Sequence, residues 1–264
     1  MLNIIRHKIK EQFRGVYLYL IFLSEFAWMY IALFPSMQKV DIEAMMAQMP
    51  KEFVGFLGEG GAAAYNTIEG FLSGEFFSFF FVLLIIFYVA SVAGSIIAGG
   101  IEKRTIDFDL SQPISRTRKL LSETAVAMFY SFFLVFATNI LIKILCEIYS
   151  VSIGSKGLFL FSIVAVLFVW AIYGIAIFLS SIFKSKIAVV GVTIFFTLGS
   201  YIFYALSLAV EKIKDYGKYS IYNFYDPQKI LSKAEININQ CLILLAIFII
   251  GLLLSLVIFN KKDV

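Results

Sequence analysis

Few side chains in this sequence could do chemistry, and the most conspicuous is a carboxylate inside an apolar stretch. Glu25 lies in the middle of the first long hydrophobic segment, and Asn139 lies deep in the third. The single histidine is His7, and the two cysteines, Cys146 and Cys241, are too few for a disulfide framework or a metal cluster. The sequence contains neither a G-x-S-x-G nucleophile pattern nor a G-x-x-x-x-G-K-[ST] phosphate-binding loop. It therefore predicts no catalytic site and no nucleotide site in this chain.

The composition explains where these side chains must sit. The chain has 264 residues, of which 61% are hydrophobic and 15% charged, and its mean hydropathy is +0.90. Soluble domains average about 45–50% apolar and about 25% charged residues. A water-soluble core could not bury so much apolar surface, which excludes a soluble enzyme, a disordered chain and a nucleic-acid-binding module. We interpret the net charge of +4 as a sign of membrane topology rather than of nucleic-acid binding.

Six segments are apolar enough to cross a bilayer, which takes about 20 mostly apolar residues. They cover about 16–34, 76–99, 121–147, 158–183, 187–210 and 240–259. We expect helices, because a chain in lipid must satisfy its backbone hydrogen bonds internally and the alternating pattern of a membrane barrel is missing. The predicted fold class is an all-α membrane protein, with a single transmembrane domain over residues 1–264.

Basic residues in the loops predict the orientation. With the N-terminus in the cytoplasm, the inside segments hold thirteen of the 22 Lys and Arg residues. They hold only six of the 18 Asp and Glu residues, counting Glu123 at the inner end of the third span. Loops on the cytoplasmic side carry such an excess of Lys and Arg. Both ends are therefore predicted to be cytoplasmic.

The segment before the first span has an apolar stripe at helical spacing, with basic residues beside or opposite it. The stripe consists of Leu2, Ile5, Ile9, Phe13 and Val16. It predicts an amphipathic helix on the inner membrane interface, close to anionic headgroups. The alternative is an ordinary basic flank that only fixes topology.

Two outside segments separate spans. Between the first two spans we expect short amphipathic helices over about 41–48 and 51–57 on the outer surface, interrupted by Pro50. The second segment, 211–239, is rich in Tyr and Lys. It either forms a short structured cap or supplies aromatic and basic side chains to the membrane interface, and we prefer the second interpretation.

The inside loop 100–119 carries the most specific pattern. Charged and apolar residues alternate as in a short surface helix over 101–112, which Pro113 ends. Such a helix either docks on another protein or is a solvated connection. An acidic residue, a Thr step, an acidic–aliphatic stretch and Pro-x-Ser-Arg follow one another before the third span. The matching residues are Glu102, Thr105, Ile106-Asp107-Phe108, Leu110, Gln112-Pro113, Ser115-Arg116 and Glu123.

This loop, in this topology, resembles the permease subunits of ATP-binding-cassette (ABC) exporters of the type-2 class, which includes drug, bacteriocin and sodium exporters. Arg104 stands where that family usually has Gly. Met49-Pro50 with Phe56-Leu57-Gly58, and Tyr225-Asp226-Pro227, also resemble segments of the family. The resemblance covers nearly the whole chain as a layout.

The resemblance implies a function and partners. The loop would be a coupling helix that contacts a separate cytoplasmic ATPase, which binds ATP and Mg and is present in two copies. A second permease copy or a paralogue would complete a twofold assembly in the plasma membrane. The chain itself would be a permease and no enzyme, and it would export a drug, an antimicrobial peptide, a lipid-like molecule or an ion. The implied contact residues are Glu102, Lys103, Arg104, Thr105, Asp107, Phe108, Asp109 and Arg116.

Glu25 and Asn139 are the candidate pathway residues. A carboxylate at membrane depth costs a few kcal/mol, about 3 on insertion scales, so Glu25 should face the bundle, a dimer seam or a water-filled cavity. It could line a pathway, accept a proton or bind a cationic group; otherwise it is hydrogen-bonded or paired within the bundle. Asn139 either joins the pathway or bonds a neighbouring helix.

Two other function classes compete with the permease. An intramembrane enzyme, such as a protease or lipid transferase, needs a nucleophile with a base, or metal ligands, at membrane depth. The sequence offers none of these sets. A non-transporting membrane sensor or immunity module remains an alternative, and an adjacent gene for an ATPase with Walker motifs would argue against it.

Overall fold

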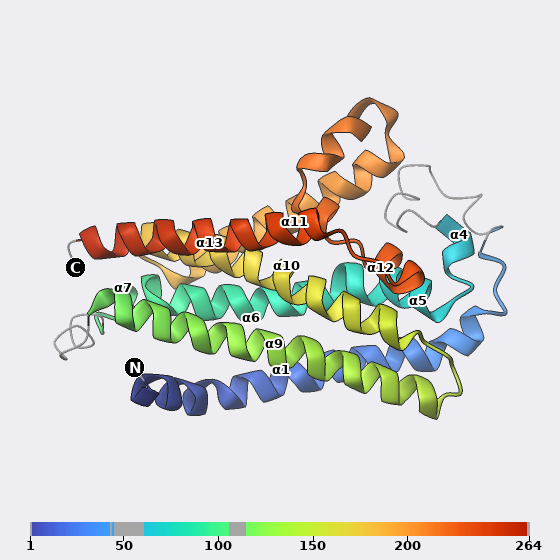
Figure 1. The fold of residues 1–264 in the computed structure, drawn as a ribbon, viewed down its shortest axis with the longest axis horizontal. Coiled ribbons are helices and arrows are strands. Elements are labelled where there is room, and N and C mark those ends of the chain that lie inside the picture. Colours follow the sequence, from blue (N-terminus) through green and yellow to red (C-terminus); the bar gives the residue numbers. More distant parts are fainter. Residues whose placement is uncertain (1, 43, 45–60, 106–114, 263–264) are drawn as a thin grey trace.

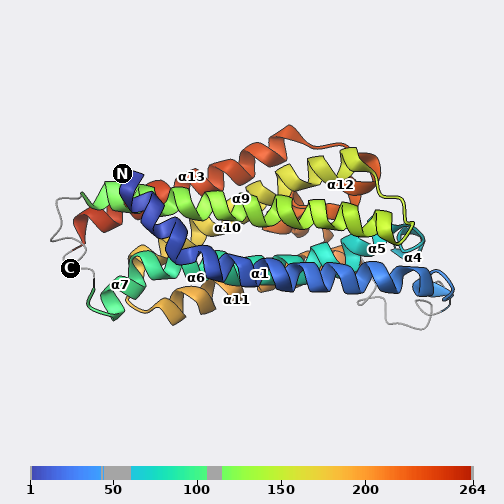
Figure 2. The ribbon, with the colours of Figure 1, turned by 90° about the horizontal axis from the view of Figure 1, so that it is seen from below.

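The computed structural model of the chain describes residues 2–42, 44, 61–105 and 115–262. Over these residues the protein is nearly all helical and contains no strand, and six of its helical segments are long and apolar enough to cross a membrane. The long helices run side by side in one bundle, with the N- and C-termini at the same end (Figures 1 and 2). This arrangement confirms the predicted all-α membrane fold.

The spans are formed by the following elements. They are α1 (Leu2–Met37), then α5 (Ile68–Phe71), the π-helix η2 (Leu72–Phe80) and α6 (Phe81–Ile96) as one span, α9 (Arg116–Ile148), α10 (Ser155–Ile182), α11 (Lys186–Ala209) and α13 (Ile238–Lys261). The shorter elements are α4 (Gly61–Ala64), α7 (Ala98–Glu102), the 3₁₀ helices η3 (Glu211–Tyr219) and η4 (Ile221–Phe224), and α12 (Pro227–Lys233). All six predicted spans are present.

After the first span, which begins at Ile5 rather than near residue 16, the second span differs most from its predicted limits, because it begins at Ile68 rather than near residue 76. Its first turns contain glycines and two glutamates, so this part of the sequence is less apolar than the rest of the span. The structure gives both carboxylates partners: Glu69 accepts a hydrogen bond from the Gly154 N–H at 3.0 Å, and Glu75 accepts one from the Tyr65 hydroxyl at 3.0 Å. The span can therefore include these two glutamates near its outer end, because each has a hydrogen-bond donor outside the span.

The segment before the first span is helical, as predicted, but it continues without interruption into the span as part of α1. Its N-terminal part is bent relative to the rest of α1 (Figure 2). The Tyr130 hydroxyl of α9 donates to the Ile9 carbonyl of α1 at 2.6 Å, and a side chain that bonds inside a helical ladder is a known cause of bending. Its position on the membrane interface stays a prediction.

The two outside segments have different outcomes. Most of the predicted helices at 41–48 and 51–57 lie outside the described residues. The segment 211–239 forms a structured cap of η3, η4 and α12, and Tyr222 and Tyr225 are buried in it. The Tyr225 ring stacks on Phe168 with a centroid distance of 4.3 Å, and its hydroxyl donates to the Phe77 carbonyl at 3.1 Å. The preferred interfacial interpretation is wrong for these two tyrosines, because the cap folds back onto the outer ends of η2 and α10.

Helix α10 is the most enclosed span, and its most extensive contact is with α13. The two backbones approach so closely at Gly174 and Gly251 that side chains are excluded. A Cβ atom on Gly174 would lie 2.7 Å from the Phe248 Cα and 2.9 Å from the Phe248 carbonyl oxygen. Small residues permit such approaches between helices in membranes, where van der Waals packing holds helices together.

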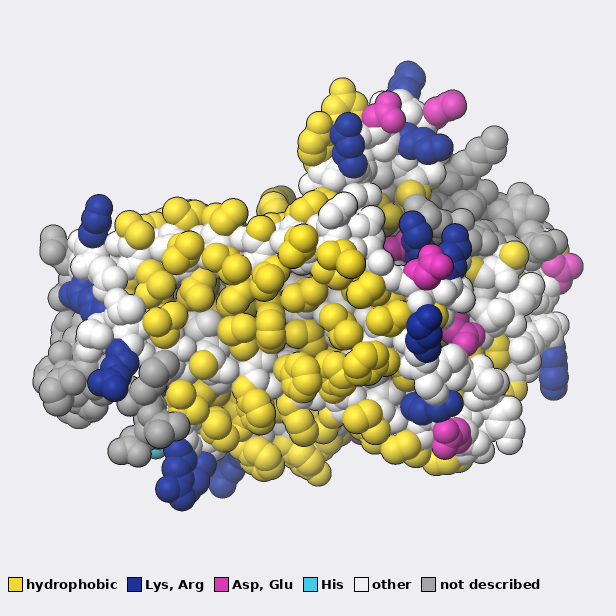
Figure 3. Space-filling view, viewed as in Figure 1, with side chains coloured by type: hydrophobic (Ala, Val, Ile, Leu, Met, Phe, Trp, Pro, Cys, Tyr) yellow, Lys and Arg dark blue, Asp and Glu magenta, His cyan; other side chains and the backbone are white. Residues whose placement is uncertain are grey.

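Charge is distributed unequally between the two ends of the bundle. On the face shown in Figure 3, apolar side chains cover the middle, and every visible acidic side chain lies toward the end that is opposite the termini. Among the residues drawn in colour, no acidic side chain is visible on this face at the end that carries both termini, where Lys and Arg gather. The cytoplasmic position of that end, which is called the inner end below, stays a prediction.

The close approach of α10 and α13 leads to a stability prediction. Gly251→Ala should lower the free energy of unfolding by about 1–3 kcal/mol, because the new methyl group meets the Gly174 backbone, which cannot rotate away. Gly199→Ala is the matched control, because a Cβ atom at that helical position meets nothing within 4 Å. Thermal unfolding of the purified variants in detergent measures both. Equal stability of the two variants would contradict the proposed packing.

Candidate functional site

The candidate site lies at the inner end of the second span, where α6 ends and α7 begins. The helix breaks at Ile97, and the Ser180 hydroxyl of α10 accepts a hydrogen bond from the Ala98 N–H at 3.2 Å. This buried bond satisfies a donor that the break would otherwise leave without a partner. The start of α7 is therefore tied to the central helix of the bundle.

Helix α7 ends in a tight turn at Arg104. The Arg104 N–H donates to the Ile101 carbonyl at 3.1 Å, and the Thr105 N–H donates to the Gly100 carbonyl at 2.9 Å. This pair of bonds defines a Schellman motif, whose turning residue adopts the left-handed conformation. Arg104 does so with φ of 53°. Glycine takes this conformation without steric cost, which explains why a glycine is usual there in the type-2 exporters that the loop resembles.

Glu102 fastens the end of α7 to the beginning of α11. Its carboxylate accepts a hydrogen bond from the Lys186 backbone N–H at 2.7 Å and another from the Ser185 hydroxyl at 3.3 Å. Ser185 stands at the N-cap of α11 and makes no capping bond with its own side chain. The Glu102 carboxylate therefore caps α11 from outside, where its negative charge also suits the positive end of the helix dipole.

Arg116 makes the corresponding connection from the beginning of α9 to the end of α13. Its guanidinium donates to the Phe259 carbonyl at 2.9 Å and to the Lys262 carbonyl, and it lies 5.7 Å from the centre of the Phe259 ring. Asn260 adds a hydrogen bond from its amide to the Thr117 hydroxyl at 3.0 Å. A cation that bonds the last carbonyls of a helix gives these unpaired acceptors a donor. The negative end of the helix dipole also stabilises the positive charge.

The C-terminal end of the described chain is tied to α10 in turn. The Lys262 ammonium donates to the Ser181 carbonyl at 2.7 Å. Burial, together with the neighbouring Lys184, lowers the pKa of Lys262. The inner ends of α9, α10 and α13 are thus joined through Arg116 and Lys262.

Of the predicted contact residues, Glu102, Lys103, Arg104, Thr105 and Arg116 are described, and they flank the segment 106–114 on both sides. Asp107, Phe108 and Asp109 lie outside the described residues. The predicted surface helix over 101–112 is described only in its first residues, where α7 ends at Glu102. The structure thus adds what the sequence did not indicate: each side of the segment is bonded to the end of a different span.

Comparison with protein families places these features in a known group. Residues 2–264 match the family model described as ABC-2 family transporter protein. The chain belongs to the ABC-2 transporter family. It is therefore a multi-pass membrane permease of an ABC transporter, the component of the family that associates with an ABC ATPase. No curated protein matches the sequence in a direct comparison.

The two candidate pathway residues of this ABC-2 permease do not come together in a single chain. Glu25 lies on the exposed face of α1, next to the exposed side chains of Phe22 and Met29. Asn139 is buried, and its amide donates to the Ser162 hydroxyl of α10 at 2.7 Å. The bond from Asn139 is the contact that the helix-packing interpretation of this residue requires. Glu25 does not point into its own bundle, so of the expected surroundings a seam between copies or a cavity beside the bundle remains.

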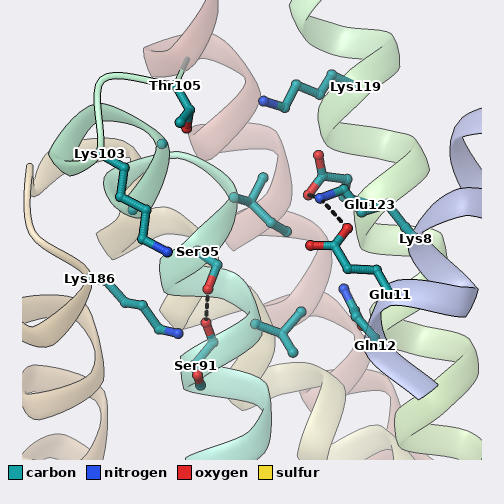
Figure 4. A pocket seen from close by; sticks show the side chains of 14 residues that line it. Lys8, Glu11, Gln12, Ser91, Ser95, Lys103, Thr105, Lys119, Glu123 and Lys186 are labelled. Atoms are coloured by element: carbon teal, nitrogen blue, oxygen red, sulfur yellow. Dashed lines mark hydrogen bonds and ion pairs between the residues drawn. The ribbon is translucent and has the colours of Figure 1, made fainter. Parts of the chain in front are cut away.

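Sequence reasoning missed a polar cavity of about 370 Å³ at the inner end of the permease (Figure 4). Its charged lining residues come from four separate parts of the chain: Lys8, Glu11, Lys103, Lys119, Glu123 and Lys186. In the sequence these residues look only like the ordinary charged flanks of the spans, so nothing there indicates a shared cavity. The cavity appears only when α1, α6, α9 and α11 are packed together.

The turn at Arg104 leads to a prediction that tests the geometry of the site. Arg104→Gly should raise the free energy of unfolding by up to about 1 kcal/mol, because relief of about 1–2 kcal/mol of left-handed strain exceeds the entropy cost of glycine, about 0.5–1 kcal/mol. Arg118→Gly, at an exposed α-helical position in α9, should lower it. Thermal unfolding in detergent compares the two, and a loss of stability in both would exclude the left-handed turn.

Proposed function

We propose that this ABC-2 permease is the membrane-spanning subunit of an exporter, in which the segment 101–116 transmits the movement of a separate ATPase to the spans. The observation that carries the proposal is the attachment of both sides of this segment. Glu102 bonds the first turn of α11, and Arg116 bonds the last turn of α13. A displacement of the segment would therefore act on two spans directly.

The groups that Glu102 and Arg116 bond determine how well a movement of the segment reaches the spans. The shorter bond of Glu102 and both bonds of Arg116 are made to backbone groups at helix ends rather than to flexible side chains. A backbone group moves with its whole helix, whereas a side chain can absorb a displacement by changing its rotamer. Charge-assisted hydrogen bonds of this kind contribute about 1.5–3 kcal/mol each, enough to keep the segment attached while it is displaced.

The two attached spans differ in how firmly the bundle holds them. Helix α13 packs along α10, and Ser255 adds a hydrogen bond to the Ile177 carbonyl of α10 at 3.1 Å. Helix α11 has the smallest buried share among the six spans of the described chain. Because a smaller share of its residues is buried inside the chain than in any other span, α11 is the span that a displacement at Glu102 would move most.

The remaining parts of the proposal follow from the family and from the sequence. Two ATPase subunits bind ATP and Mg, since this chain carries no Walker motif. The assembly stands in the plasma membrane and exports a drug, an antimicrobial peptide, a lipid-like molecule or an ion. Nucleic acid is not among the partners.

The coupling role can be tested on the complex of this permease with the ATPase that copurifies with it. Glu102→Ala and Arg116→Ala should retain the ATPase, because the other six implied contact residues remain, but should reduce transport-linked ATP hydrolysis severalfold. Asp107→Lys should instead lower the yield of the complex, because charge complementarity guides docking. Lys261→Gln, at an exposed position of the same end, serves as the control.

Parental transport and ATP hydrolysis in the double variant Glu102→Ala/Arg116→Ala would contradict the coupling role. Failure to copurify any ATPase with the parental protein would instead favour the sensor or immunity module. The two results are distinguishable, because the first concerns activity within a complex and the second concerns the existence of the complex.

We also infer that a second permease copy covers the exposed face of α1. Phe22, Glu25 and Met29 repeat at steps of three and four residues and form one exposed stripe. Trp28, one turn from Glu25, donates to the Tyr149 hydroxyl at the outer end of α9 at 2.9 Å, which places Glu25 in the outer half of the span. A carboxylate that faces lipid costs about 2.5–3.5 kcal/mol at the bilayer centre and less toward the interface. A twofold partner on this stripe would remove Glu25 from lipid and place it in a seam, where a pathway between the copies could use it.

Cross-linking tests this seam. In a background with Cys146→Ala and Cys241→Ala, Met29→Cys should form a disulfide-linked dimer on mild oxidation of membranes. Leu253→Cys, on the exposed face of α13, is the control and should remain monomeric, because α1 and α13 lie on different sides of the bundle (Figures 1 and 2). Cross-linking of Leu253→Cys but not of Met29→Cys would place the seam elsewhere.

A further inference from the structure

The cavity at the inner end has a charge pattern that the coupling role does not use. It lies between α1 and α9 on one side and α6, α7 and α11 on the other. The ammonium groups of Lys103 and Lys186 point into it from one side, and Lys8, Glu11 and Glu123 face them from the other (Figure 4). The two walls differ in net charge.

The wall formed by α1 and α9 balances its own charges. The Lys8 ammonium lies 2.9 Å from a Glu11 carboxylate oxygen and 4.0 Å from a Glu123 carboxylate oxygen. Lys119 and Glu123 are both buried and stand four residues apart on α9, where opposite charges attract. Two lysines and two glutamates therefore leave this wall neutral.

Among the lining residues that the structure describes, the opposite wall has two lysines and no carboxylate. The nearby Glu102 carboxylate is engaged with the beginning of α11. The orientation of the Lys186 side chain is also restricted, because its aliphatic part packs against the second span. A Cβ atom on Gly94 would lie 3.3 Å from the Lys186 Cγ. Counted over these described residues, the cavity has an excess of two positive charges, which favours an anionic ligand.

Uncharged polar groups on the two walls add directional donors and acceptors. Ser91 and Ser95 of α6 line the cavity, and Ser95 donates to the Ser91 carbonyl at 2.7 Å. The Gln12 amide oxygen is buried and has no partner within the part of the chain that the structure describes. An unpaired buried acceptor calls for a donor, so the ligand should carry a hydroxyl or ammonium group close to its negative charge.

The position of the cavity indicates the physical form of this ligand. It lies where the apolar parts of α1, α6 and α11 give way to charged residues, which is the depth of the headgroups in a bilayer. Phe13 follows the lining residue Gln12 and is 59% exposed, and Ile187 follows Lys186 and is 78% exposed. Apolar side chains at the rim would contact acyl chains while the polar interior held a headgroup.

We propose that this cavity binds a phosphate group that carries a neighbouring hydroxyl or amine, as in the headgroup of a phospholipid of the adjoining leaflet. Lys103 and Lys186 bind the phosphate, Ser91 donates to it, and the Gln12 amide accepts from the hydroxyl or ammonium group. The volume of about 370 Å³ accommodates a headgroup of this size. This site goes beyond the transport function and does not depend on the identity of the cargo.

The test uses the purified permease in detergent and measures binding of dihexanoyl phosphatidylglycerol by calorimetry. The double variant Lys103→Gln/Lys186→Gln should raise the dissociation constant at least tenfold. Lys184→Gln/Lys261→Gln removes the same charge from exposed positions outside the cavity lining and should change it less than twofold. Lys103→Arg/Lys186→Arg keeps the charge and should restore most of the affinity.

Separate arms distinguish the source of the phosphate. Inorganic phosphate and glycerol phosphate should compete only weakly if the acyl chains contribute at the rim, whereas full competition by them would assign the same site to a soluble phosphate compound. Equal affinity of the cavity variant and the parent, or equal loss in both double variants, would overturn the proposal. Copurification of the ATPase is measured in parallel, so that failure of this site is separated from failure of the coupling role.

Discussion

The direct contact between the backbones of α10 and α13 is the constraint on which the rest of the bundle depends. Lipid removes the hydrophobic force that would drive helices together in water, so close packing must supply the attraction. Gly174 and Gly251 provide it by leaving no side chain between the two helices. Because α10 also contacts the second, third and fifth spans, its pairing with α13 forms the rigid centre of the chain. Arg116, which bonds the end of α13, is therefore connected to that centre.

The two sides of the segment 106–114 are attached to parts of unequal rigidity. The Arg116 side is joined to α13 and, through Lys262, to α10. The Glu102 side is joined to α11, which has little buried surface in the single chain. A force applied between the two attachments would move α11 relative to the centre, rather than translate the whole bundle. This unequal attachment would convert a force on the segment into a relative movement of spans, since the Arg116 side stays fixed while the Glu102 side moves.

The sequence predicted those features that follow from a local physical requirement. The six spans follow from the need of every backbone group for an internal partner in lipid, and hydropathy locates them within a few residues except at the beginnings of the first and second spans. Glu102 and Arg116 were identified through a family resemblance, but their partners were not, because these lie 84 and 143 residues away in the sequence. The burial of Tyr225 and the exposure of Glu25 likewise depend on how helices are placed against one another. No hydropathy pattern contains that information.

The π-helix η2 affects how any residue-by-residue scan of the second span should be interpreted. Its i→i+5 bonding changes the spacing of side chains, and buried pairs occur at 72–73, 76–77, 81–82 and 85–86. An α-helical period extended outward from α6 would assign Gly74 to the protected face and would misplace Phe76. Accessibility data for this span therefore need two periods that change at Phe81. A single fitted period would rotate the outer third of the helix and assign lipid-facing positions to the interior.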